Sequence, residues 1–255
     1  MKIKIIGCSG AEFPGHNSPS FLLDDEIAFD AGSITDSLTE KAQLMIKHIF
    51  ITHAHLDHIK SIPFLADNII VGSMVHRVTI MSIPPVIKTI KMHLFNSTMW
   101  PDFTVIPHPD DAVLKLVKLK YNSPVELNGY TVTPFRVNHA VPSVGYLVED
   151  RKKRRFFYTG DTGPTAGTWR KIAGTAINCL IIDVSFPNSM ESLAIQTGHL
   201  TPNLLKEELA NFRHLPEQIC ITHPKPQHLK TIRSELNRLH IKNLIILREG
   251  DIIKV

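Results

Sequence analysis

The feature that most constrains the fold of this chain is an apolar strand pattern followed directly by a cluster of residue types that bind metals. The stretch HIFIT leads directly into HAHLDH, which spans residues 53–58. Imidazole nitrogen and carboxylate oxygen are the donors that zinc takes in proteins, at about 2.0–2.2 Å. A chain that leaves a strand and turns into a helix can direct such side chains at two adjacent points, whereas a solvated polar turn, the alternative, fits poorly after an apolar strand. The segment therefore predicts metal binding by His53, His55, Asp57 and His58.

The rest of the chain alternates apolar stretches typical of strands with stretches of helical spacing. Strand patterns occupy residues 2–7, 20–25, 27–32, 48–52, 69–72, 78–83, 113–120, 130–140, 144–150, 156–163, 179–186, 218–224 and 244–255. Helical patterns occupy residues 35–47, 85–95, 204–212 and 229–239. Two strand-rich halves, each followed by helices, indicate two facing β-sheets with helices outside, although periodicity alone allows other α/β layouts.

Composition is that of an ordinary globular protein. The 255 residues are 43% apolar and 20% charged, and the net charge of +4 suits an anionic substrate better than a dedicated nucleic-acid interface. Residues 1–10 alternate like a strand, which is untypical of a secretory signal, and no run reaches the roughly 18 apolar residues of a membrane span. Cys8, Cys179 and Cys220 form no CxxC pair and lie in or beside apolar runs, so we expect buried thiols and a cytoplasmic protein.

HxHxDH at the end of an apolar strand resembles the metallo-β-lactamase superfamily. Four further residues occur in the order that this family shows: Asp30 in FDAG, His139 in VNHAVPSVGY, Asp161 in TGDTG and His223 in ITHPKP. The resemblance runs from about residue 2 to the C-terminus. It implies a four-layer αββα sandwich of two mixed β-sheets, formed by one domain of residues 1–255 with similar halves, roughly 1–125 and 126–255.

The resemblance also implies a role for each of these residues. His53, His55 and His139 would hold one metal ion, and Asp57, His58 and His223 a second, with Asp161 shared between them. Asp30 would orient a ligand histidine without touching the metal. Taken singly, His139 could be an ordinary strand histidine, and Asp161 or Asp30 a turn residue.

Histidine at position 55 indicates hydrolysis, because superfamily members that bind two irons and handle dioxygen typically have glutamate there. Two cations about 3.5–4 Å apart would share a water of pKa about 7 and stabilise the entering and leaving oxygens. This arrangement suits a phosphodiester, which concentrates negative charge. Zinc is the first expectation for both divalent ions, with manganese and iron as alternatives.

The segment GHLTPNLLKEELA, after SFPNSMESLA, resembles one found in ribonuclease Z and in class II cyclic-nucleotide phosphodiesterases. There, a histidine near a helix start contacts the phosphate or assists the leaving oxygen, and His199 has that place. Asp57 and His199 are thus the expected catalytic residues. Thr201 would cap the helix and leave backbone N–H groups for an anion, and Lys225 would lie near a phosphate oxygen. The alternatives are a plain capping segment with an incidental histidine and a solvated loop lysine.

Details of the sequence favour the cyclic-nucleotide branch. HAHLDHIKSIP, HLFNSTMWPDF at residues 93–103, and THPKP resemble that branch, whereas ribonuclease Z usually has glycine where Leu56 stands. No insertion matches the Gly- and Pro-rich arm with which ribonuclease Z grips tRNA. The basic cluster RKKRR, residues 151–155, lies between two strand patterns and fits a hairpin turn better than an RNA-binding patch.

The sequence thus predicts a metal-dependent phosphodiesterase that converts 3′,5′-cyclic nucleotides, cyclic AMP or cyclic GMP, to nucleoside 5′-monophosphates through a hydroxide that bridges the metals. The expected partner is a small anionic diester, with no membrane; nucleic acid is the less favoured partner and stays open, and a homodimer follows from family habit. Three alternatives stay open. They are a tRNA 3′-end endonuclease like ribonuclease Z, another hydrolase of this fold, and a non-catalytic metal-binding protein.

Overall fold

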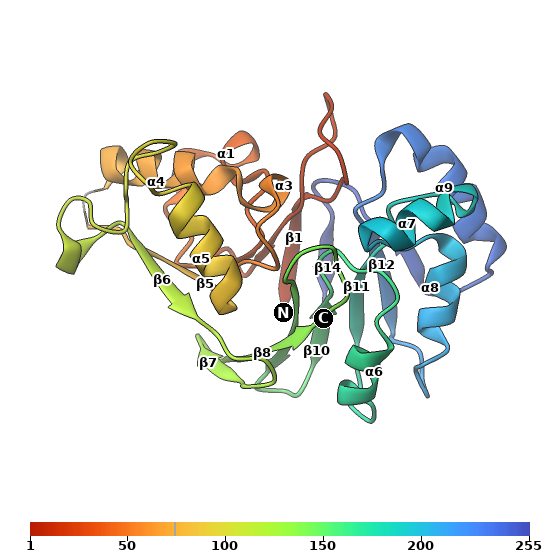
Figure 1. The fold of residues 1–255 in the computed structure, drawn as a ribbon. Helices are drawn as coiled ribbons and strands as arrows, with labels where there is room; N and C mark the ends of the chain where they lie inside the picture. Colours follow the sequence, from red (N-terminus) through yellow and green to blue (C-terminus); the bar gives the residue numbers. More distant parts are fainter. Residues whose placement is uncertain (74) are drawn as a thin grey trace.

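The computed structural model describes residues 1–73 and 75–255, and within them the strands form two seven-stranded sheets (Figure 1). In spatial order, the first sheet consists of β14 (Ile252–Lys254), β1 (Lys2–Gly7), β2 (Ser20–Leu23), β3 (Ile27–Phe29), β4 (His48–Phe50), β5 (Val78–Ser82) and β6 (Leu114–Lys118). The second consists of β13 (Leu244–Ile246), β12 (Gln218–Thr222), β11 (Cys179–Asp183), β10 (Arg155–Tyr158), β9 (Val144–Asp150), β8 (Tyr130–Arg136) and β7 (Val125–Leu127). Both sheets contain parallel and antiparallel pairs, as predicted for mixed sheets.

Helices cover the outer faces of the two sheets (Figure 1). Beside the first sheet lie α1 (Ile34–Ser37), α2 (Glu40–Gln43), α3 (Leu56–Ile59), α4 (Ser61–Gly72) and α5 (Pro84–His93). Beside the second lie α6 (Ala166–Ile172), α7 (Glu191–Thr197), α8 (Pro202–Leu209) and α9 (Leu229–Arg238). Single 3₁₀ turns span Pro109–Asp111, Asn188–Met190 and Pro226–His228. No helix among the described residues is both long and apolar enough to cross a membrane.

Aromatic side chains fill the space between the sheets. The rings of Phe29 on β3 and Phe156 on β10 lie 5.4 Å apart, and those of Phe50 on β4 and Tyr146 on β9 lie 5.2 Å apart. A second apolar cluster packs β11 and β12 against α6, α8 and α9, and includes Trp169. The layers are therefore helices, sheet, sheet, helices, and the predicted αββα sandwich is confirmed.

Two local predictions on the first sheet's side need correction. Residues 69–72 are not a strand but the last turn of α4, whose buried residues Ile62, Leu65 and Ile69 recur at helical spacing. The predicted helix over residues 35–47 is two short helices, α1 and α2, because Leu38 is extended between them.

The basic cluster of residues 151–155 forms the turn between β9 and β10, as predicted. Lys153 has a left-handed φ of 63°, and its ammonium lies 2.6 Å from a carboxylate oxygen of Glu149. Arg154 pairs with Glu217 at 2.8 Å. Several of these charges are therefore neutralised by neighbouring acids. All three cysteines are buried and free, which also agrees with the sequence.

Parallel pairing brings distant segments to one edge of the sandwich. β3 pairs in parallel with β4, and β10, β11 and β12 pair in parallel with one another. The carboxyl ends of parallel neighbours lie at the same edge, where open α/β sheets commonly bind ligands. The segments that follow these strands carry Asp30, His53, Asp161 and His223, and Asp183 is the last residue of β11.

Candidate metal centre

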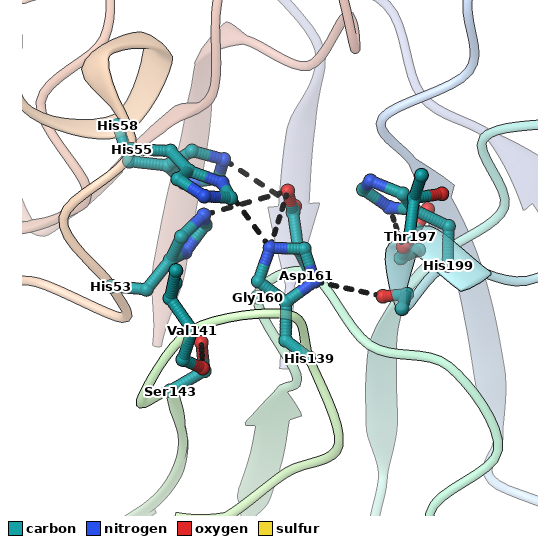
Figure 2. Close-up of polar contacts among 12 residues, drawn as sticks. His53, His55, His58, His139, Val141, Ser143, Gly160, Asp161, Thr197 and His199 are labelled. Carbon is teal, nitrogen blue, oxygen red and sulfur yellow. Dashed lines mark hydrogen bonds and ion pairs between the residues drawn. The ribbon is translucent and has the colours of Figure 1, made fainter. Parts of the chain in front are cut away.

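His53, His55 and His139 converge on Asp161 (Figure 2). The ligand atoms offered by His53, His55, His139 and Asp161 all lie within 4.8 Å of one another. Nε2 of His53 is 3.6 Å from Oδ2 of Asp161, and Nδ1 of His55 is 3.2 Å from Nε2 of His139. These four residues come from three separate segments, yet they surround one point.

A second group shares the same carboxylate. Asp57, His58 and His223 offer ligand atoms within 4.8 Å of one another, and Nε2 of His223 is 3.4 Å from Oδ2 of Asp57. Asp161 reaches this group as well, since its Oδ1 lies 3.3 Å from Nε2 of His58 and its Oδ2 lies 3.4 Å from Nε2 of His223. The seven residues predicted as ligands are thus brought together in two adjacent groups, with Asp161 between them.

Two buried nitrogen atoms suit a metal better than the protein alone. Nε2 of His53 and Nε2 of His58 are inaccessible to solvent and have no hydrogen-bond partner. A buried polar atom without a partner is costly, and a cation bound in each group would satisfy the nitrogen atom of that group. Burial lowers the pKa of His53 well below its usual value, and it also lowers the pKa of His55 and of His139. Neutral imidazole is the form that binds metal, so these three histidines fit a divalent ion.

Asp30 lies behind His58, where the family resemblance implied. Its Oδ2 accepts a hydrogen bond of 2.8 Å from Nδ1 of His58. The backbone N–H of Thr52 donates to Oδ1 at 2.8 Å, and the Thr52 hydroxyl also points to this carboxylate. Because Nδ1 of His58 is engaged in this way, its Nε2 is directed at Asp161.

A buried network under His199 was not predicted from the sequence. Nδ1 of His199 donates to Oδ2 of Asp183 over 2.7 Å, and the Ser185 hydroxyl donates to Oδ1 of Asp183 over 2.6 Å. Ser185 in turn accepts a hydrogen bond of 2.8 Å from Nδ1 of His223. Burial alone would lower the pKa of His199, but the neighbouring Asp183 carboxylate outweighs it and raises the pKa. One signal was available: Asp183 ends the apolar strand CLIID.

The two residues predicted to contact substrate lie beside this network. Thr201 is buried and caps α8, as predicted, with its hydroxyl accepting a 3.3 Å hydrogen bond from the backbone N–H of Leu204. The Lys225 ammonium donates to the carbonyl oxygen of Gly10 and lies 5.8 Å from the ring centroid of Phe186. The Phe186 ring is itself 5.7 Å from that of His199. A substrate contact by either residue stays a prediction.

The centre is open to solvent next to α3. His53 and His58 are fully buried, whereas the Asp57 side chain is 34% exposed and His55 is partly exposed. Leu56, between the two, is 66% exposed. A small substrate would therefore reach the ligand residues from the side of Asp57 and His55.

Comparison with known proteins identifies relatives for most of the chain. A family model described as "Beta-lactamase superfamily domain" matches residues 35–223. The chain is 27% identical to a probable 3′,5′-cyclic-nucleotide phosphodiesterase of Yersinia pestis over 81% of this chain and 67% of that protein. It is 28% identical to a ribonuclease Z of Pyrococcus horikoshii over 79% of this chain and 68% of that protein. For other relatives with these two names, the match covers as little as 49% of the relative's length.

The solved structure of unliganded yeast PDE1 has a similar fold, with a TM-score of 0.85 and 21% identity over 100% of this chain and 99% of that one. At this identity, the likeness shows the fold alone.

Proposed function

This chain belongs to the metallo-β-lactamase superfamily of metal-dependent hydrolases, and on that basis we propose that it hydrolyses 3′,5′-cyclic nucleotides to nucleoside 5′-monophosphates. The observation that carries the proposal is the pair of ligand groups that share Asp161, at an edge that is open to small molecules. Four of the relatives that support it are named 3′,5′-cyclic-nucleotide phosphodiesterases.

The proposed ligands form two sets. His53, His55 and His139 hold one divalent ion, and the second set consists of Asp57, His58 and His223, with Asp161 between the two. Zinc is the first choice because imidazole nitrogen and carboxylate oxygen dominate the donors. Two bound ions would make a nearby water acidic enough to ionise near neutral pH and would offset negative charge on the phosphate.

Asp57 and His199 are the proposed catalytic residues. Burial alone would raise the pKa of Asp57, but its hydrogen bond with His223 and the nearby His58 lower it instead, so the carboxylate stays ionised and can orient the attacking water by accepting a hydrogen bond from it. His199 holds a proton because Asp183 favours its charged form, and with Nδ1 bound to Asp183 the other ring nitrogen is left to protonate the departing 3′-oxygen.

Lys225 and Thr201 complete the proposed substrate pocket. Lys225 lies close enough to lower the pKa of His199 slightly through its charge, so it can also offset charge on a phosphate held beside that histidine. Its hydrogen bond to Gly10 holds the ammonium in place. Thr201 acts through the N-terminus of α8, whose remaining backbone N–H groups favour an anion.

Ribonuclease Z activity is the second candidate, favoured by the relatives of that name, whose identity to this chain is similar, at 28–30%. A substrate panel on metal-reconstituted protein separates the two. It contains cyclic AMP, cyclic GMP, a precursor tRNA and bis(p-nitrophenyl) phosphate. We expect turnover of a cyclic nucleotide. Cleavage of the tRNA with neither cyclic nucleotide turned over would replace our proposal with the second candidate, and turnover of the activated diester alone would point to another hydrolase of this fold.

A further inference from the structure

Tyr158 links the second sheet to Asp30, the carboxylate that holds His58. It is the last residue of β10, only 1% exposed, and its hydroxyl donates a 2.7 Å hydrogen bond to Oδ2 of Asp30. Asp30 belongs to the other sheet's side, directly after β3. A tyrosine hydroxyl that ends on a buried carboxylate forms a charge-assisted bond, which is stronger than one between neutral groups.

The oxygen that Tyr158 contacts is the one that orients His58. Oδ2 of Asp30 accepts from both the Tyr158 hydroxyl and Nδ1 of His58, the latter at 2.8 Å. Burial raises the pKa of Tyr158 well above its usual value, so the hydroxyl remains a donor. If that donor is lost, Oδ2 keeps the Thr52 hydroxyl at 2.9 Å but is held by one bond fewer, so the orientation of the His58 ring is less firmly fixed.

These contacts form a ring of four residues, His58, Asp30, Tyr158 and Asp161, around the proposed ligand His58. Nε2 of His58 faces Oδ1 of Asp161 at 3.3 Å, and Figure 2 shows the two side chains directed at each other. Asp161 follows Tyr158 by three residues, so one segment of chain supplies both the shared carboxylate and the hydroxyl that fixes Asp30. Two sets of contacts thus fix the position of His58 relative to Asp161. One is their direct contact, and the other runs from His58 through Asp30 to Tyr158, which is on the same segment as Asp161.

We propose that Tyr158 is a positioning residue for the second metal ion, acting through Asp30 on His58. This inference rests on the ligand sets given under the proposed function. Groups that orient a metal-binding histidine commonly change metal affinity by about 10–100-fold when they are removed. In the first set, Nδ1 of His139 contacts the carbonyl oxygen of Gly198, and Nδ1 of His53 lies 3.0 Å from the Thr52 hydroxyl rather than against Asp30 or Tyr158, so Tyr158 affects mainly the second ion.

Tyr146 offers a matched control. It lies directly opposite Tyr158 across the β9–β10 pair and is fully buried. Its hydroxyl also donates a 2.7 Å hydrogen bond into the first sheet's side, but to the backbone carbonyl oxygen of Ile51. Replacing either tyrosine by phenylalanine removes one buried hydroxyl and keeps the ring, so the two variants differ in whether Asp30 loses a donor.

The experiment compares Tyr158→Phe and Tyr146→Phe by zinc titration against a chromophoric chelator, with thermal unfolding of both metal-free proteins. We expect Tyr158→Phe to weaken the second zinc about 10–100-fold and leave the first unchanged, while Tyr146→Phe binds both zinc ions as wild type does. Equal zinc affinities in the two variants, or equal weakening of both ions in Tyr158→Phe, would overturn the inference.

A second variant covers the case in which metal-free Tyr158→Phe does not fold. Asp30→Asn keeps a carbonyl oxygen for the backbone N–H of Thr52 but replaces the oxygen that accepts from Tyr158 and from Nδ1 of His58, so it breaks the same connection. A lower affinity for the second zinc ion alone supports the inference, and an equal loss of affinity for both zinc ions contradicts it. Failure of the proposed centre is a separate result, because wild type would then bind fewer than two zinc ions per chain.

Discussion

Replacing His199 by alanine tests the proposed proton donor. The imidazole is 9% exposed and contacts Asp183, so its loss removes a buried hydrogen bond as well as a proton. Asp183 keeps other partners, the Ser185 hydroxyl at 2.6 Å and the backbone N–H of Thr162 at 3.2 Å. We therefore expect the variant to fold and to bind metal nearly as wild type does, since none of the proposed ligands is changed.

The expected loss of rate for His199→Ala follows from general acid catalysis, which contributes roughly 10²–10⁴-fold. This corresponds to about 3 to 5 kcal/mol of transition-state stabilisation, at 1.36 kcal/mol for each tenfold. The loss should depend on the leaving group. In a cyclic nucleotide, the 3′-oxygen leaves phosphorus as a poorly stabilised alkoxide, which needs a proton. Bis(p-nitrophenyl) phosphate releases a phenolate that is stable without one.

The assay measures kcat for both substrates, together with metal per chain by elemental analysis. A large loss on the cyclic nucleotide and a small one on the activated diester, at unchanged metal content, is the expected result. Asp183→Asn should change kcat in the same sense, because it removes the charge that raises the pKa of His199. An equal loss on both substrates would refute the proton-donor role, and loss of metal would mean that His199 is a ligand.

Three further predictions concern other parts of the centre and its support. Asp161→Ala should strip metal and abolish turnover, as should His55→Ala, and a variant with two metal ions per chain and a near-normal rate would disprove the ligand sets. Lys225→Met should lower kcat/KM for a cyclic nucleotide about 10–100-fold at unchanged metal content, as expected for a charged hydrogen bond worth about 1.5–3 kcal/mol; an unchanged value would remove Lys225 from the pocket. Burial raises the pKa of Glu208 above 4.5, so its folded form binds protons more tightly and the free energy of unfolding should fall as pH rises through and above that value. Glu208→Gln should flatten this dependence in denaturant unfolding of the metal-free protein, and an unchanged slope would contradict it.

The sequence predicted most about segments whose chemistry is local. Residues 53–58 carry four ligand candidates in one turn after a strand, and a buried strand ending in such a turn directs them together whatever the rest of the fold is. Thr201 was recognised as a cap for the same reason, since capping needs only the next few backbone N–H groups. The strand predicted at residues 69–72 was wrong because these few apolar residues, read alone, fit the period of a strand and that of a helix equally well. The helical spacing of α4 becomes clear only with the buried residues one and two turns earlier, Leu65 and Ile62.

Residues that act across the sandwich could not be found from spacing. His139, Asp161 and His223 were assigned by family resemblance, because spacing alone does not say which strands are neighbours. Asp183 and Tyr158 were missed altogether, since each acts through a side chain from a different segment, His199 and Asp30. Both are nevertheless at or next to the end of an apolar strand in the parallel trio β10, β11 and β12.

That position has a physical cause that sequence reasoning can use. In the observed register, Tyr158 pairs with Ile181 and Asp183 pairs with Thr222, so the ends of β10, β11 and β12 lie almost level. A polar residue at the end of one of these strands, such as Asp183, reaches the same edge of the sheet as its neighbours. A polar residue that pairs two positions earlier, as Tyr158 does with Ile181, is buried between the layers. An acid or hydroxyl that ends an apolar strand is therefore a candidate for the site or its support once the strands are known to be parallel. The missing information is strand adjacency, and the contacts of Tyr158 and Asp183 show how much of the centre depends on it.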